Sequence, residues 1–367
     1  MGSYRFILAL FVAISHTPGS GLMSNLGASS VMCFYFISGW LMTYSFRQFE
    51  AHSPKPVFSF YEDRFIRLYP TYLAVMLVSL AVYHFVIGYA LSPMRIAAEL
   101  LLFPLGYPRL IGWEQGTVAS VPTAWSLAVE LHFYLALPFF LRAGLKTRVA
   151  ITFALCALHI LAMKSARPLG YWLPVCPFRE ATCALPTSDV LGMDWPFLTS
   201  GIFFFGTLAH EAFMSRKLAL WPVLVVYGAY LFTYLVWAPG HGWIFNPYNV
   251  YDILLGVSLL VPLAVCIFLA EPRLRIDPRA DKFLGNLAYP LFLSHFLGIN
   301  VIVHFFGKLP DNRFVYVQCL AIAFALAVLF SLLQQKVVDP FRYWVRGFGE
   351  RGARLNGDTL RGERSLA

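Results

Sequence analysis

Long apolar stretches, separated by short polar or basic segments, dominate the pattern of residues along the chain. Each is close to the roughly 20 residues that an α-helix needs to cross a bilayer, and none alternates with the period of two typical of a barrel strand. We therefore predict an all-α, polytopic membrane helix bundle with about ten transmembrane helices. The expected spans are residues 4–22, 28–46, 71–91, 124–142, 149–164, 196–213, 219–237, 250–270, 286–306 and 314–336.

The composition supports a membrane protein. Hydrophobic residues make up 59% of the 367 residues and charged residues only 13%, which lies outside the range of soluble globular domains. The spans 4–22 and 149–164 are the weakest, because the first contains Pro18 and the second is short. The first stretch has a second interpretation, as the apolar part of a secretory signal peptide with Arg5 as its positive flank.

The basic residues are unevenly distributed between the two sides of the predicted bundle. With a cytoplasmic amino terminus, 21 of the 28 Lys and Arg residues fall in cytoplasmic segments. The positive-inside rule then favours two cytoplasmic termini and an even number of spans. We divide the chain into a transmembrane domain, 1–340, and a basic cytoplasmic tail, 341–367. This topology and contact with anionic lipid explain the net charge of +9, so no nucleic-acid partner is expected.

Two connections on the predicted outer side, 92–123 and 165–195, are long enough to take part in recognition. Cys176 and Cys183 both fall in the second connection, where an oxidising compartment would permit a disulfide. The sequence leaves open whether they are paired.

Arg5 and His16 lie at opposite ends of the apolar run that opens the chain. They are eleven positions apart, which is about three helical turns, so they share one face of a helix. The axial rise between them is roughly 16 Å. If Arg5 lies at a membrane surface, His16 therefore lies near the middle of the bilayer.

Ionisable side chains inside spans cost roughly 2.5–3.5 kcal/mol each on insertion scales, so each of them requires a role. Glu130 either pairs with a buried Arg or His for structural reasons, or orients the His16 imidazole and stabilises its charged form. Both interpretations predict that Glu130 faces the interior of the bundle. The complete set of candidates is His16, Glu130, His132, Asp252, His295 and His304.

Two short polar features lie in or beside the second and third spans. Arg64 and Arg67 are three residues apart, so they share a helical face at the expected cytoplasmic surface, next to water. They are either an ordinary positive-inside flank or paired guanidinium forks that hold a polyphosphate. Ser38 and Gly39 lie midway along the second span, where small residues permit close helix approach or leave room for a substrate chain.

Five segments resemble motifs of the acyltransferase 3 family of integral membrane acyltransferases, in the family's order. Arg5 and His16 match its Arg-x10-His motif, and FYFISG resembles its element in the second helix. The other three segments are DRFIRLYP, which resembles the Arg-x-x-Arg segment, WSLAVELHFYLALP, and LAYPLFLSHF, which ends near His295. Each motif is weak alone, but five in order are specific, and the resemblance extends to about residue 336.

The resemblance implies an enzyme of the bacterial inner membrane. It would move an acyl group, commonly acetyl, from cytosolic acyl-coenzyme A (acyl-CoA) to a hydroxyl of a carbohydrate or lipid-linked glycan. It also implies ten helices and a cytoplasmic amino terminus. No metal is expected. The acceptor, the acyl chain, the oligomeric state and the choice between direct transfer and a covalent intermediate stay open.

The resemblance also implies roles for individual residues. Arg64 and Arg67 would hold the phosphates of coenzyme A, and Arg5 would help to place the thioester. His16 would act on the acceptor hydroxyl or on a proton relay.

We assign Glu130 to catalysis beside His16, and Ser38 and His295 to substrate binding. A neutral imidazole, with an unperturbed pKa near 6.5, can accept a proton at physiological pH, and such catalysis typically contributes about 10²- to 10⁴-fold.

Two other classes of function remain. A proton-coupled transporter could use His16, Glu130 and Asp252 as a relay, although it would not need Arg64 and Arg67 as a ligand clamp. A membrane scaffold of a polysaccharide export machine would leave all of these polar positions structural.

Overall fold

A computed structural model describes residues 2–17, 24–89, 92–106, 119–172, 196–215, 261, 264–265, 277–306 and 313–345. All regular secondary structure within these ranges is helical, which confirms the all-α prediction for this part of the chain. In the described part of the chain, four helical segments are long and apolar enough to cross a membrane: Pro56–Ile87, Ala124–Arg142, Pro278–Phe306 and Val315–Trp344. The total of ten spans and the cytoplasmic termini stay predictions.

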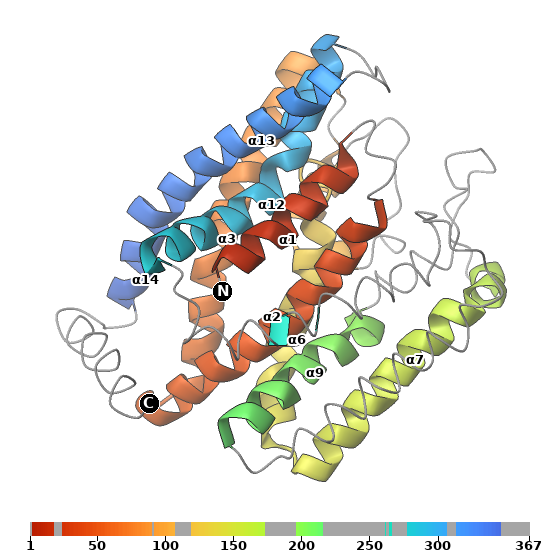
Figure 1. Ribbon diagram of the computed structural model, residues 1–367, viewed down its shortest axis with the longest axis vertical. Helices are drawn as coiled ribbons and strands as arrows, with labels where there is room; N and C mark the ends of the chain where they lie inside the picture. The colour runs from red at the N-terminus through yellow and green to blue at the C-terminus, as the bar shows by residue number, and fades with distance from the viewer. Residues whose placement is uncertain are drawn as a thin grey trace.

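The helices form two neighbouring groups in Figure 1, with α1, α12 and α13 in one and α2, α9 and α7 in the other. The spans predicted at 219–237 and, for the most part, 250–270 lie outside the described residues, as do Asp252, Cys176 and Cys183. The long helices are α1 (Gly2–His16), α2 (Ser24–His52), α3 (Pro56–Val82), α6 (Ala124–Arg142), α7 (Leu145–Trp172), α9 (Pro196–Ser215), α12 (Pro278–Phe306) and α13 (Arg313–Leu333). The short elements are η1 (Tyr83–Ile87), α4 (Pro93–Leu101), η2 (Phe103–Gly106), η5 (Gln334–Val338) and α14 (Asp339–Val345).

Several helices extend beyond the apolar windows that predicted them. α3 begins at Pro56 and continues through Pro70, whereas the prediction placed its start at residue 71. A window of apolar residues detects only the part of a helix that is suited to lipid, and a polar first half is missed. Arg64 and Arg67 therefore lie within α3 itself and not in a segment before it.

α1 and α12 lie side by side and run in the same direction (Figure 1). At their amino ends, the Asp281 carboxylate accepts hydrogen bonds from the backbone N–H groups of Gly2 and Ser3, both at 2.8 Å. It thereby caps the otherwise unsatisfied first turn of α1. Fourteen residues further along each helix, His16 meets His295. These two contacts fix the register of the pair.

α2 and α9 approach each other at backbone distance. A Cβ atom on Gly39 would overlap the carbonyl oxygen of Phe203, and a Cβ atom on Gly206 would overlap that of Phe36. Small residues at such positions allow two helices to pack closely without lipid between them. The structure therefore confirms close helix approach as the reason for a small residue at Gly39.

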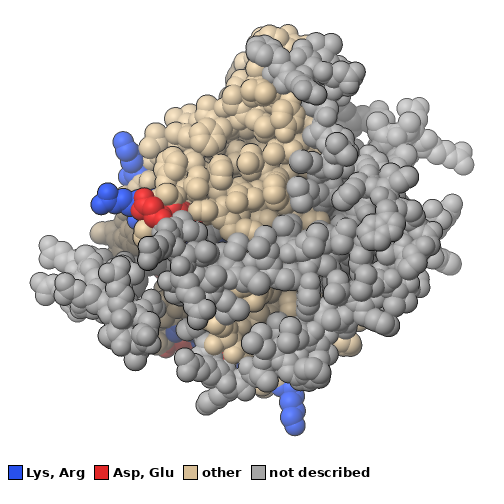
Figure 2. Space-filling model, in the orientation of Figure 1, with Lys and Arg blue, Asp and Glu red and all other residues tan. Residues whose placement is uncertain are grey.

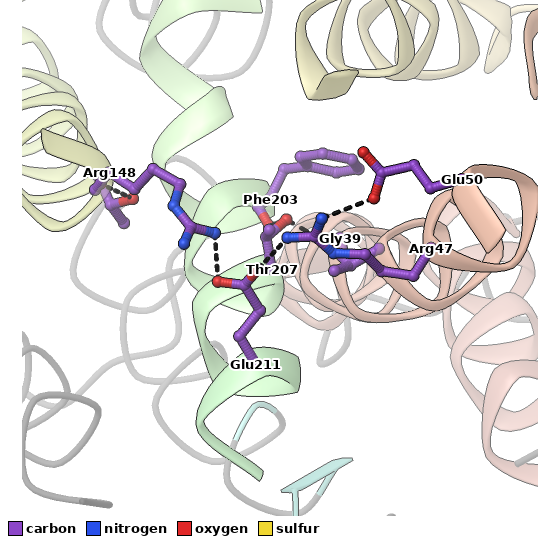
Figure 3. Close-up of polar contacts among 9 residues, drawn as sticks. Gly39, Arg47, Glu50, Arg148, Phe203, Thr207 and Glu211 are labelled. Atoms are coloured by element: carbon purple, nitrogen blue, oxygen red, sulfur yellow. Dashed lines mark hydrogen bonds and ion pairs between the residues drawn. The ribbon is translucent and has the colours of Figure 1, made fainter. Parts of the chain in front are cut away.

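An ion-pair network joins the same two helices to α7 (Figure 3). Glu211 of α9 accepts a hydrogen bond from Arg47 of α2 at 2.8 Å and pairs with Arg148 of α7. Arg47 also pairs with Glu50 at 2.6 Å. One carboxylate therefore holds three helices together at this end of the bundle.

The first part of the connection predicted as an outer loop after α3, residues 92–106, packs against the bundle. The hydroxyls of Tyr69 and Tyr72, in the middle of α3, donate to the carbonyl oxygens of Leu100 at 2.6 Å and Glu99 at 2.8 Å. The buried Glu99 carboxylate accepts from the backbone N–H of Ser120 at 3.0 Å. Non-helical backbone is tolerated at membrane depth where protein buries it. α4 is therefore part of the bundle.

The described surface is largely uncharged on the face drawn in Figure 2. Lys, Arg, Asp and Glu lie at the left and lower edges of this view, and the broad upper area is tan. α13 presents exposed apolar side chains, including Val317, Phe324 and Leu329. An apolar surface with charges at its rim suits contact with lipid.

Replacing Gly39 with Ala should destabilise the contact between α2 and α9. The added methyl group must displace backbone, for which overpacking costs of about 1–3 kcal/mol are typical. We expect a lower thermal unfolding midpoint for the detergent-solubilised protein. Gly144→Ala is the control, because nothing lies within 4 Å of a Cβ at that position. Equal midpoints for the two variants would contradict the prediction.

Candidate functional site

Arginines from α1, α3 and α14 gather at one level of the bundle. Arg67 interacts electrostatically with Arg5, Arg64 and Arg342. Two carboxylates lie among these four cations, so positive charge is in excess. We call the following six residues the arginine cluster: Arg5, Asp63, Arg64, Arg67, Glu130 and Arg342.

Arg64 is engaged within the protein. Its side chain is 4% exposed and forms an ion pair with Asp63. Its guanidinium also lies 3.0 Å from the Met42 sulfur and donates to the Ser45 hydroxyl at 3.2 Å. The sequence placed Arg64 next to water, and the structure differs because a buried carboxylate and α2 satisfy the charge. Arg64 thus joins α2 to α3.

Arg5 and Arg67 differ from Arg64 in both burial and pairing. Both side chains are only partly buried. Among the residues that the structure describes, neither guanidinium makes a hydrogen bond or an ion pair. An arginine carries five N–H donors in a planar fork, which matches carboxylate and phosphate groups. The N–H groups of Arg5 and Arg67 are therefore available to an anionic ligand.

Glu130 faces the interior of the bundle, as predicted. One carboxylate oxygen accepts hydrogen bonds from the Ser38 hydroxyl on α2 and from the Tyr134 hydroxyl at 2.5 Å. The same carboxylate interacts electrostatically with Arg5. Glu130 consequently belongs to the arginine cluster. The pairing with His16 that the sequence suggested is not found among the described contacts.

The partner of His16 is His295. The Nδ1 atom of His295 lies 2.9 Å from the carbonyl oxygen of Phe292 and 3.2 Å from that of Leu291. A carbonyl oxygen only accepts, so this Nδ1 carries the hydrogen and Nε2 of the neutral ring is an acceptor. The His16 Nδ1 lies 3.2 Å from that Nε2 and 2.9 Å from the Val12 carbonyl oxygen. It therefore also carries a hydrogen.

This arrangement leaves the Nε2 atom of His16 as an unprotonated acceptor. The His295 side chain is completely buried, whereas His16 is exposed. The two rings stack with centroids 5.3 Å apart, and Phe296 packs on His16 at 4.5 Å. We call His16 and His295 the histidine pair. Its geometry presents one oriented basic nitrogen at the protein surface.

The arginine cluster and the histidine pair lie at different heights along α1. Arg5 and His16 share one helix, Gly2–His16, and their separation along its axis is roughly 16 Å. A ligand that engages both must therefore carry its anionic group and its reactive group at opposite ends.

Sequence reasoning missed three members of this site. Asp63, Tyr134 and Arg342 were not singled out, although Asp63 directly precedes Arg64 in DRFIR and a local charge pair could have been expected there. Arg342 was assigned to the basic tail that begins at residue 341. It is 8% exposed and bound to Asp63, a contact between distant segments that no local pattern predicts.

Residues 4–332 match the family model that is described as an acyltransferase domain. The match covers nearly all of the described helices, and it defines the protein as a membrane acyltransferase. The chain belongs to the acyltransferase 3 family. An uncharacterized protein of Aquifex aeolicus (strain VF5) is similar, with 24% identity over 229 residues, which are 61% of this chain and 90% of that protein. No solved structure matches the chain.

Replacing His295 with Ala should lower the kcat of acyl transfer by at least about tenfold, as part of the 10²- to 10⁴-fold typical of general-base catalysis. The reason is that His16 loses one of the two acceptors of its Nδ1–H and the ring stacked against it, so that its orientation is less fixed. His295→Gln should restore part of the rate, because the amide oxygen can accept from Nδ1–H. Steady-state kinetics would check this.

The matched control is His304→Ala, which removes an exposed histidine of the same helix. A similar loss in both variants, or a change in KM for the donor without a change in kcat, would argue against this role of His295.

Proposed function

We propose that the enzyme transfers an acyl group, acetyl in the simplest case, from cytosolic acyl-CoA to a hydroxyl of a carbohydrate or lipid-linked glycan at the bacterial inner membrane. One observation carries the proposal. The Arg5 and Arg67 guanidinium groups have no hydrogen-bond or ion-pair partner among the described residues, and the oriented imidazole of His16 lies roughly 16 Å from Arg5 along α1. Acyl-CoA has phosphates at one end and its thioester at the end of a long flexible arm. The phosphates would bind the guanidinium groups, and the thioester would reach the imidazole.

The arginine cluster supports the donor part of the proposal. We assign phosphate contacts to Arg67 and Arg5, because their N–H groups have no partner among the described residues. Arg64, which the sequence paired with Arg67, acts mainly by its charge and by holding α2 against α3. Arg5 lies roughly 16 Å from His16, so a phosphate contact suits it better than a contact with the thioester.

The histidine pair supports the chemical step. Nε2 of His16 accepts the proton of the acceptor hydroxyl while the hydroxyl oxygen attacks the thioester carbonyl carbon. His295 accepts the hydrogen bond from Nδ1–H and so keeps the basic nitrogen directed outward. The carbon–sulfur bond of the thioester breaks, the thiolate of coenzyme A leaves, and His16 gives the proton to this thiolate. The thioester is already activated, so positioning supplies much of the remaining acceleration.

Ser38 and Glu130 support the site from α2 and α6. The Ser38 hydroxyl donates to Glu130, and Glu130 interacts electrostatically with Arg5. A carboxylate at this position holds the Arg5 guanidinium in the cluster without neutralising the excess positive charge. We therefore place both residues in the wall of the donor site.

Incubation of purified protein with acetyl-CoA tests the donor assignment directly. We expect saturable binding and slow release of coenzyme A, measured with a thiol reagent. Mass spectrometry of surface glycans from cells with and without the gene would identify the acceptor. An absence of acetyl-CoA binding, with correctly folded protein, would contradict the proposal.

His16→Ala should abolish acyl transfer while donor binding and membrane level stay close to those of the wild type. The variant loses the base but little packing volume. His84→Ala, at another exposed histidine, is the control. Transfer at the wild-type rate in His16→Ala would remove His16 from catalysis.

Arg67→Ala and Arg64→Ala should have different effects. A lost charge-assisted contact of roughly 1.5–3 kcal/mol predicts a rise of about tenfold or more in the donor KM for Arg67→Ala. Arg67→Lys should recover only part of it, because an ammonium lacks the planar fork. Arg64→Ala should raise the donor KM less than Arg67→Ala does, because it removes a nearby charge and no phosphate contact. It should also reduce membrane level and thermal stability, since it removes one partner of buried Asp63. Donor KM values that change equally in both Ala variants would contradict this unequal assignment.

A further inference from the structure

Arg342 connects the end of the described chain to the arginine cluster. It lies in α14, beyond the segment 4–332 that matches the family. Its Nε donates to one Asp63 carboxylate oxygen at 2.6 Å and its second nitrogen donates to the other at 3.0 Å. The Asp63 side chain is 1% exposed and that of Arg342 is 9% exposed. This is a buried, bidentate ion pair.

Other contacts hold this part of the chain in place without Arg342. Gln334, in η5, accepts a hydrogen bond from Thr71 of α3. The Gln334 amide donates to the Asp339 carboxylate, at the start of α14, at 2.9 Å. Gln334 therefore links the start of α14 to α3 without Arg342, so attachment alone does not account for Arg342.

Asp63 has two cationic partners among the described residues, and both contribute to the charge of the site. The carboxylate pairs with Arg64 as well as with Arg342. α3 contributes two cations, Arg64 and Arg67. If Arg64 were the sole partner of Asp63, the two charges would cancel and only Arg67 would remain. With Arg342 present, the group of three keeps one positive charge. Charges in a dry interior are felt strongly because the effective dielectric constant is low.

The remaining positive charge of Asp63, Arg64 and Arg342 lies close to Arg67, which we assigned to phosphate binding. Arg67, which has no hydrogen-bond or ion-pair partner among the described residues, interacts electrostatically with both Arg64 and Arg342. Cations packed this closely repel one another, which is a cost that an anionic ligand would remove. The cluster is thus suited to a ligand with more than one negative charge.

We propose that Arg342 compensates the charge of Asp63 and thereby keeps the arginine cluster cationic enough to bind the phosphates of the acyl donor. This inference rests on the proposed function. Arg342 is a positioning residue, since it acts through Asp63 and does not touch the donor. A residue beyond the matched family segment would then set the affinity of the donor site.

Charge compensation predicts an order of donor affinity among four proteins. The formal charge of Asp63, Arg64 and Arg342 together is +1 in the wild type. It falls to zero in Arg342→Met, rises to +2 in Asp63→Asn, and returns to +1 when both changes are combined. The KM for acetyl-CoA should be highest in Arg342→Met, similar in the wild type and the double variant, and lowest in Asp63→Asn.

The measurement is steady-state kinetics with acetyl-CoA on protein of known membrane level. We expect Arg342→Met to raise the donor KM roughly fivefold or more, in the range of measured couplings between contacting residues, with kcat within about twofold. The added Asp63→Asn change should return KM to within about twofold of the wild type. Lys336→Met removes one exposed charge from the same part of the chain and serves as the matched control.

A purely structural ion pair gives a different result. Asp63→Asn would then add damage to Arg342→Met, and the KM of the double variant would stay high, which would overturn the inference. If Arg342→Met fails to accumulate in the membrane, the other two variants still test the inference. Charge compensation predicts a donor KM equal to the wild-type value for the double variant and below it for Asp63→Asn. A wild type that does not bind acetyl-CoA would contradict the proposed function. A wild type that binds it, with KM unchanged in Arg342→Met, would contradict only charge compensation.

Discussion

The parallel contact between α1 and α12 determines where Arg5, His16 and His295 lie. The Asp281 carboxylate caps α1 at one end of the contact, and the hydrogen bond between His16 and His295 closes it at the other. A straight pair of helices held at two points leaves no freedom in register. Arg5, between those points, is thereby set at the height of Arg67 and Glu130. The segments involved are nearly 280 residues apart, so the site exists only in the folded bundle.

The second constraint is the balance of charge inside an apolar bundle. A buried charge is tolerated when it is paired and hydrogen-bonded, and Arg64 and Glu99 follow this rule. Arg5 and Arg67 depart from it within the described part of the chain. Proteins commonly violate a folding rule where function requires it. On α3, Arg64 is paired and Arg67 is not, within the described residues. The paired arginine supports the structure of the site, and the other is available to a ligand.

The sequence predicted part of this structure. The span predicted at 124–142 coincides with α6, Ala124–Arg142, because its apolar window is bounded by Pro122 and Arg142. The prediction that Glu130 faces inward was correct, since a carboxylate in a span has few other choices. Its partner was not predictable, because a pattern along one helix does not say which of several polar residues on other helices comes closest.

The remaining differences arise from contacts between distant segments. The start of α3 was misplaced because the apolar window begins only after its polar first half, whereas the helix begins at Pro56 and contains Pro70. The burial of Arg64 depends on α2 and Asp63, and that of Arg342 on α3. The return of α4 into the bundle depends on two tyrosines of α3. Spacing and composition describe one segment at a time and do not contain this information.

The length of α12 on either side of His295 determines how deep the chemistry lies. The Thr123 hydroxyl, just before α6, donates to the Phe292 carbonyl oxygen at 3.0 Å, one turn from His295. From His295 to the end of α12 at Phe306 there are eleven residues, a rise of roughly 16 Å, which equals the rise from Arg5 to His16. From the start of α12 at Pro278 to His295 there are 17 residues, a rise of roughly 26 Å, so the basic nitrogen lies within the length of this part of the bundle and away from both ends. Under the proposed function, two reactants that approach from opposite ends would meet inside the bundle, and neither would have to cross all of it.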